Sequence, residues 1–104
     1  MSNEPLSEQY RISAKAWVEL DAAASMLEET KSAVLSQEML RHGDMPVSRA
    51  EMLVKASEQW NKHIDQMVRA RQRANLAKVK LEWIRMKFSE QQSFEATKRA
   101  EMKL

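Results

Sequence analysis

The sequence predicts an all-α protein, a long antiparallel helical hairpin that resembles a coiled coil and forms one domain over residues 1–104. Three observations predict this class. The chain has only one glycine and two prolines, so few residues interrupt a helix. Apolar residues recur at alternating intervals of three and four in both halves of the chain. Between the halves lies one short break that contains Gly43 and Pro46.

The first helix is expected over about residues 6–41. Pro5 suits the first turn of a helix, where its missing N–H group has no partner to lose. Glu8 complements the positive end of the helix dipole. At the other end, His42 suits the negative end of the dipole, and Gly43 is expected to take the left-handed conformation that ends many helices.

A turn over residues 42–47 should separate the two helices. Pro46 cannot continue the first helix, and Ser48 begins a capping-box pattern with Glu51. In such a box the serine oxygen accepts from the backbone N–H of the glutamate, whose carboxylate reaches back. The second helix is therefore expected to start near residue 49.

Two ends for the second helix fit the sequence. It either stops near residue 88 or continues to 104. If it stops, the stretch Ser89–Gln92 is a second capping box, which would start a short third helix over about residues 90–103.

One apolar seam should join the two helices. Bending the chain at Asp44 places residues whose numbers sum to about 89 side by side, so Trp17 and Leu20 should lie near Ala70 and Ala74. Large side chains on one helix would then meet small ones on the other, as close packing requires. The seam positions are Tyr10, Ser13, Trp17, Leu20, Ala24, Leu27, Lys31 and Val34 in the first helix, and Leu53, Ala56, Trp60, His63, Met67, Ala70, Ala74, Ala77, Leu81, Ile84 and Phe88 in the second.

The hairpin leaves apolar surface uncovered. The second arm is longer than the first, so the stretch from about Ile84 onward has no intramolecular partner. The second helix also carries a second apolar stripe that faces away from the seam: Ile64, Val68, Leu76, Val79, Trp83 and Met86. We therefore predict a homo-oligomer, a dimer or larger bundle, and a non-enzymatic interaction or assembly function that also admits a different protein partner. The predicted interface residues are Val79, Trp83, Met86, Phe88, Phe94 and Met102.

A basic segment of the second helix suggests an alternative function. Up to Val47 the chain has four basic and eight acidic residues, whereas from Ser48 onward it has thirteen basic and seven acidic ones. One interpretation is that the basic side chains flank the seam and pair with Glu8, Glu19 and Asp21. The other is a nucleic-acid-binding accessory protein that contacts phosphates along this helix. The residues concerned are Arg69, Arg71, Arg73, Lys78, Lys80, Arg85 and Lys87.

Catalytic, metal and cofactor sites are not expected. One glycine cannot build a phosphate-binding loop or a nucleophile elbow, and no cysteine is present. His63 lies in the seam without a second ligand at suitable spacing, and the Glu-x-x-His pairs of di-iron bundles are missing. The longest apolar runs are short and the first residues show no targeting pattern, so we expect a cytoplasmic protein that does not bind membranes.

Several stretches of the chain resemble small helical proteins of unknown function encoded by tailed phages and prophages. They are the segments 17–20, 27–33, 77–88 and 95–104, with the sequences Trp-Val-Glu-Leu, Leu-Glu-Glu-Thr-Lys-Ser-Ala, Ala-Lys-Val-Lys-Leu-Glu-Trp-Ile-Arg-Met-Lys-Phe and Glu-Ala-Thr-Lys-Arg-Ala-Glu-Met-Lys-Leu. The resemblance implies a bacterial or phage cytoplasmic setting, in DNA metabolism or host takeover, and it implies no catalytic residues.

Overall fold

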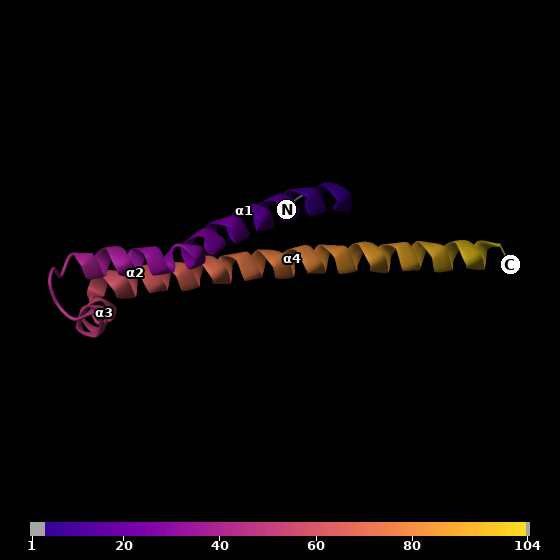
Figure 1. Cartoon of the computed structure of the whole chain (residues 1–104). Coiled ribbons are helices and arrows are strands. Elements are labelled where there is room, and N and C mark those ends of the chain that lie inside the picture. The colour runs from indigo at the N-terminus through magenta and orange to yellow at the C-terminus, as the bar shows by residue number, and fades with distance from the viewer. Residues whose placement is uncertain (1–3, 104) are drawn as a thin grey trace.

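A computed structural model describes residues 4–103 and shows an all-α hairpin, as the sequence predicts. The described part of the chain contains no strand and extends over 84 × 22 × 18 Å. The first arm consists of two helices, a short third helix follows the turn, and the long fourth helix runs back along the first (Figure 1). The helices are α1 (Leu6–Glu29), α2 (Lys31–Leu40), α3 (Val47–Lys55) and α4 (Glu58–Met102).

The first arm has a local irregularity at Thr30, which separates α1 from α2. The Thr30 hydroxyl donates to the carbonyl oxygen of Met26 at 2.8 Å, while the Thr30 N–H donates to the same oxygen at 3.0 Å. Such back-bonding by threonine often bends a helix. From Thr30 back toward its first residue, α1 diverges from α4 (Figure 1).

The turn after α2 differs in part from the sequence prediction. Gly43 has the expected left-handed conformation, with φ of 70°, but the helix already ends at Leu40. The predicted capping box at Ser48 does not form. Instead Pro46, in an extended conformation, caps α3, and its carbonyl oxygen accepts from the N–H groups of Arg49 and Ala50. Proline fixes φ at a value that suits entry into a helix, so α3 starts one residue before Ser48.

The predicted second helix is broken at Ser57, which the sequence analysis missed. The Ser57 hydroxyl accepts from the N–H of Trp60 at 3.2 Å and donates to the carbonyl oxygen of Val54 at 2.6 Å. It therefore caps α4 and closes α3 at the same point. As a result α3 does not run in line with α4 (Figure 1). Val54 is buried in place of the predicted seam residue Leu53, which is 39% exposed.

Beyond Ser57, α4 is one continuous helix to Met102. The alternative with a third helix over residues 90–103 is wrong, because the stretch from Ser89 to Gln92 lies inside α4. No proline or glycine interrupts residues 58–102, and their many glutamate, glutamine, lysine and alanine residues favour a helix. The other predicted end, residue 104, lies outside the described residues.

The seam joins α1 to α4 with the predicted faces but a different register. Ala24, Ala70 and Ala74 form a buried cluster that Leu20 packs against, as expected. The predicted register, in which the numbers of facing residues sum to about 89, would place Asp21 opposite Val68. Asp21 instead bonds to Arg71. The shift arises because α3 points away from the arm, so the connection between the arms is longer than the predicted turn.

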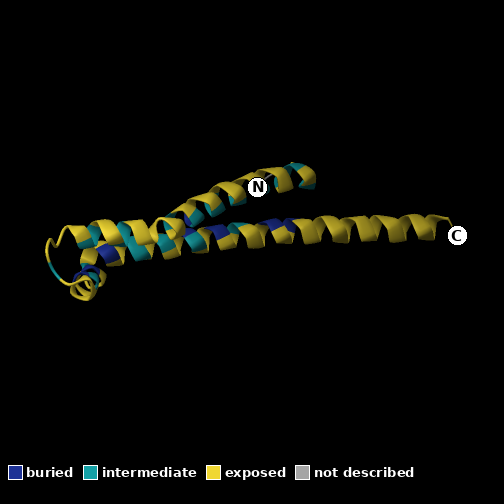
Figure 2. Ribbon diagram, viewed as in Figure 1, coloured by how far each residue is buried: buried dark blue, intermediate teal, exposed yellow. Residues whose placement is uncertain are grey.

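Burial along the seam is greatest where α1 and α4 come close. Ala24 and Ala74 are fully buried where α1 and α4 come close, and the buried positions of α4 continue through Leu81 to Ile84 (Figure 2). Every described residue from Arg85 onward is exposed. Burial along α4 therefore ends at Ile84, which is only 2% exposed, although the first turn of α1 still lies beside Phe88.

Candidate interaction surface

Both sides of α4 carry apolar residues, but α1 covers those on one side only. One side forms the seam with α1. The opposite side carries the outer stripe, which we define as the predicted second stripe of six apolar residues: Ile64, Val68, Leu76, Val79, Trp83 and Met86. Ile64 is half-buried, but Leu76, Val79 and Met86 are 61–69% exposed. A row of large exposed apolar side chains on a continuous helix marks a surface suited to association.

The candidate interface residues do not all lie on this stripe. Val79, Trp83 and Met86 do, and Phe94 continues it two turns farther along α4. Phe88 instead lies on the seam side, where it lines a pocket with Leu6 of α1. Met102 is 77% exposed near the end of α4. The structure therefore groups four of the six predicted interface residues on one side of the helix.

Arg71 belongs to the intramolecular contact and not to the free basic surface. Its Nη1 donates to Asp21 Oδ1 at 2.6 Å, and its Nε and Nη2 donate to both carboxylate oxygens of Glu28 at 2.9 and 2.6 Å. Nη2 also donates to Ser25 Oγ at 3.2 Å. This guanidinium group spans two turns of α1. Arg71 is therefore removed from the predicted nucleic-acid-binding set.

These hydrogen bonds shift the pKa values of their partners. Those from Arg71 lower the pKa of Glu28, because they stabilise its charged form. The carboxylates of Glu28 and Asp21 in turn raise the pKa of Arg71. The predicted pairing of basic residues with Asp21 is thus confirmed at one site. Glu8 pairs with Arg11 of its own helix instead.

The other cations remain on the surface of α4. Arg69 pairs with Asp65 one turn away, at 2.8 Å. The Nζ of Lys87 lies 4.4 Å from the centre of the Trp83 ring, within range of a cation–π interaction. Within residues 4–103 no ion pair forms at the four remaining predicted positions: Arg73, Lys78, Lys80 and Arg85. Arg73 and Lys80 lie beside the outer stripe, whereas Lys78 and Arg85 lie nearer the seam, where Arg85 lines a pocket with residues of α1.

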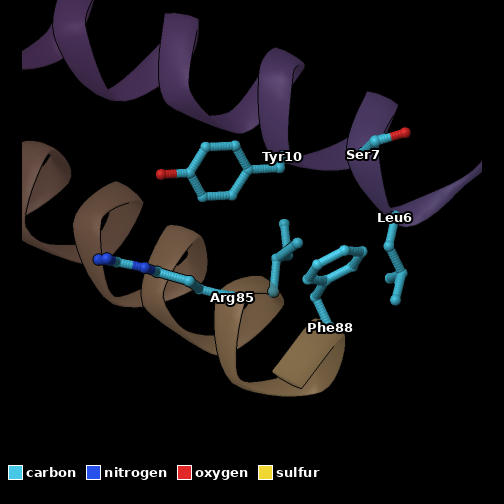
Figure 3. A pocket seen from close by; sticks show the side chains of 6 residues that line it. Leu6, Ser7, Tyr10, Arg85 and Phe88 are labelled. Carbon is cyan, nitrogen blue, oxygen red and sulfur yellow. The ribbon is translucent and has the colours of Figure 1, made fainter. Parts of the chain in front are cut away.

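A pocket of about 310 Å³ opens where the first turns of α1 meet α4. Tyr10 and Phe88 point into it from opposite helices, and Ser7 points away (Figure 3). Leu6, Ile84 and Arg85 also line it, and its wall is largely apolar. The sequence analysis did not predict this pocket, although Tyr10 and Phe88 are both seam positions. It forms because α1 diverges here and large side chains fill the wider space incompletely.

His63 is the one polar residue of the α4 seam. Its ring centre lies 5.8 Å from that of Trp60, and its buried Nε2 has no hydrogen-bond partner. In the described part of the chain, no three His, Asp or Glu residues come together as a group that could hold a metal ion. None of the helices between residues 4 and 103 combines the length and apolar character needed to cross a membrane.

Comparisons of the chain with protein-family models, with curated proteins and with solved structures returned no match.

Proposed function

We propose that this chain is a non-enzymatic helical assembly protein that associates with further copies of itself through the outer stripe of α4. The observation that carries the proposal is the exposure of this stripe. Its side chains are large and spaced as in a coiled coil, yet α1 covers only the opposite side of α4. Burying them against a second copy removes apolar surface from water, which is the main driving force for association.

The length of the stripe sets the expected strength. The part of the stripe from Val68 onward, together with its continuation to Phe94, spans about 40 Å at about 1.5 Å per residue. With a contact width of roughly 10 Å, a pair of copies buries about 800 Å² in total, below the roughly 1,200 Å² of standard stable interfaces. We therefore expect a weak, concentration-dependent dimer with a Kd in the micromolar range or above.

Sedimentation of a charge variant tests this proposal. Val79→Glu places a carboxylate at the centre of the stripe, so the variant should stay monomeric at concentrations where the natural chain dimerises. Gln66→Glu is the matched control, since it adds the same charge at an exposed position away from the stripe. If the natural chain remains a 12.1 kDa monomer up to millimolar concentration, the proposal is wrong.

We propose nucleic-acid binding by the same helix as a second candidate function. The observation that favours it is the set of four cations without ion pairs: Arg73, Lys78, Lys80 and Arg85. Each phosphate that they neutralise would release counterions, so binding should weaken steeply as salt concentration rises.

A titration of labelled single- and double-stranded DNA at two salt concentrations tests this candidate. Arg73→Ala with Lys80→Ala should reduce the affinity and the salt dependence together. Arg71→Ala is unsuitable for this purpose because it disrupts the contact between α1 and α4. The absence of binding at low salt would exclude this function.

The cellular setting follows only from the resemblance to phage and prophage proteins. On this resemblance we propose the cytoplasm of a bacterium, where an assembly protein of this size would act on other phage or host components. Expression during phage growth, followed by fractionation of the infected cells, tests this setting.

A further inference from the structure

We infer that the second copy binds antiparallel to the first, with the two-fold axis at the level of Leu81. This inference rests on the proposed self-association and assigns its geometry. It starts from the spacing of the outer stripe from Val68 onward and its continuation to Phe94, which reads the same in both directions about Leu81; half-buried Ile64 lies outside this symmetric part. The positions are Val68, Gln72, Leu76, Val79, Trp83, Met86, Glu90 and Phe94.

In an antiparallel pair centred at Leu81, each apolar residue meets another apolar residue. Val79 lies beside Trp83 of the second copy, Leu76 beside Met86, and Val68 beside Phe94. Because α4 is one unbroken helix over this whole range, the spacing in sequence is also the spacing in space. All these apolar side chains are at least 45% exposed in the single chain. Such self-complementary contacts are what a two-fold interface requires.

The polar positions also favour this direction. Gln72 lies beside Glu90 of the second copy, so its amide can donate to the carboxylate. In a parallel pair Glu90 would instead meet Glu90, and like charges repel at that spacing. Both residues are exposed in the single chain, so neither is tied to another part of the fold.

In the antiparallel arrangement the tail of α4 gains partners of opposite charge. The first turn of α1 reaches as far as Glu95, and residues 96–102 continue past it and are exposed. In the antiparallel pair they run beside the first turns of α4 of the second copy. Lys98 then lies near its Asp65, and Glu101 near its Lys62. In the single chain the side chains of Lys62 and Asp65 are 72% and 58% exposed, which leaves them accessible.

Repulsion between cations opposes association in the antiparallel pair, and its dependence on salt concentration distinguishes this pair from a parallel one. Arg73, Lys80 and Lys87 lie on the same side of the stripe, so in an antiparallel pair the two rows of cations converge. Dissolved salt screens their repulsion. The charge pairs of the tail lie at the exposed ends of the pair, where ion pairs contribute little, so the converging cations should dominate and the antiparallel dimer should become tighter as salt concentration rises. A parallel pair would place Lys87 near Glu82 of the second copy, and salt would weaken that attraction.

Disulfide trapping tests the direction, and the absence of natural cysteine makes the result unambiguous. Leu76→Cys and Met86→Cys are prepared separately, checked for helix content, and oxidised alone and as a mixture. We expect a mixed disulfide between the two variants and little disulfide in either variant alone. Sedimentation of the natural chain at low and high salt accompanies the trapping, with a severalfold lower Kd expected at high salt.

Each other result has a distinct meaning. Disulfides within each variant alone would show a parallel pair, overturning the inferred direction while self-association stands. Dimers without disulfides in any mixture would show that another surface mediates association, which overturns the inference and the role of the stripe. Monomers at every concentration and salt would overturn the proposed function itself and leave the stripe to a different partner, such as an acidic helix or a nucleic acid.

Discussion

The seam side and the outer side of α4 carry apolar residues at similar helical spacing, yet only the seam side holds α1. The difference is the size of the residues. The middle of the seam carries Ala70 and Ala74, which let the first arm approach closely, whereas the outer stripe carries Leu76, Val79 and Trp83. Helical periodicity therefore identifies both sides as apolar, and residue size indicates which of them accepts a helix from the same chain.

The largest effect is expected from enlarging the narrowest point of the seam. Ala74→Leu adds three carbon atoms to a fully buried position between two helices, so the helices must separate or the side chain must strain. Overpacking of this kind lowers the free energy of unfolding by about 1–3 kcal/mol. Thermal unfolding followed by circular dichroism measures the loss. Asn75→Leu, at the exposed neighbouring position, is the control and should leave the midpoint nearly unchanged.

A smaller loss is expected when the polar contact beside the seam is removed. Arg71→Ala deletes the hydrogen bonds that join α4 to Asp21, Ser25 and Glu28, and should lower the unfolding temperature by a few degrees. Arg69→Ala deletes an ion pair within α4 alone, which contributes little at an exposed site. Equal losses for the two variants would contradict the assignment of Arg71 to the contact between the arms.

Acid should weaken the same contact to a smaller extent. The pKa of Glu28 is lowered in the folded chain from an ordinary value of 4.5, so the unfolded state takes up a proton more readily. Its contribution to stability is therefore fully present above pH 4.5 and is lost as the pH falls through the lowered pKa. Unfolding temperatures measured between neutral pH and pH 3 should fall less for Glu28→Gln than for the natural chain. An identical fall in the unfolding temperature of the two chains would show that Glu28 does not cause the loss of stability in acid.

The smallest effect on the single chain is expected at the far end of α4. Deleting residues 96–104 removes no described buried residue, so the unfolding temperature at low concentration should not change. Self-association should weaken, because the inferred antiparallel pair uses this tail. A loss of stability in the monomer would indicate that the tail contacts α1.

Much of the fold could be predicted because helix formation depends on local sequence. The seam positions Ala24, Ala74 and Ile84 followed from their spacing, and all are buried. The break at Ser57 also had a local signal, a serine followed by Glu58 at the start of a helix, but the longer periodic pattern obscured it. The capping box at Ser48 was a pattern of the right type two residues too late, since Pro46 already caps the helix.

The candidate site was predicted less completely. The exposure of Val79, Trp83 and Met86 follows from their position opposite the seam, so the sequence was sufficient to find them. The roles of the seven cations were not separable in this way. Arg69, Arg71 and Arg73 alternate with other residues and are chemically identical. Arg69 nevertheless pairs within its own helix, Arg71 binds α1, and Arg73 has no ion pair within residues 4–103.

The sequence by itself determined the helical class, the seam residues and the apolar outer side of α4, because periodicity depends only on neighbours along one helix. The tertiary structure alone decided the register between the arms. That register depends on the direction in which α3 leaves the arm at Ser57, and no spacing along the chain encodes this direction. The register in turn places Arg71 opposite Asp21 and Glu28, and it determines how far α1 reaches along α4.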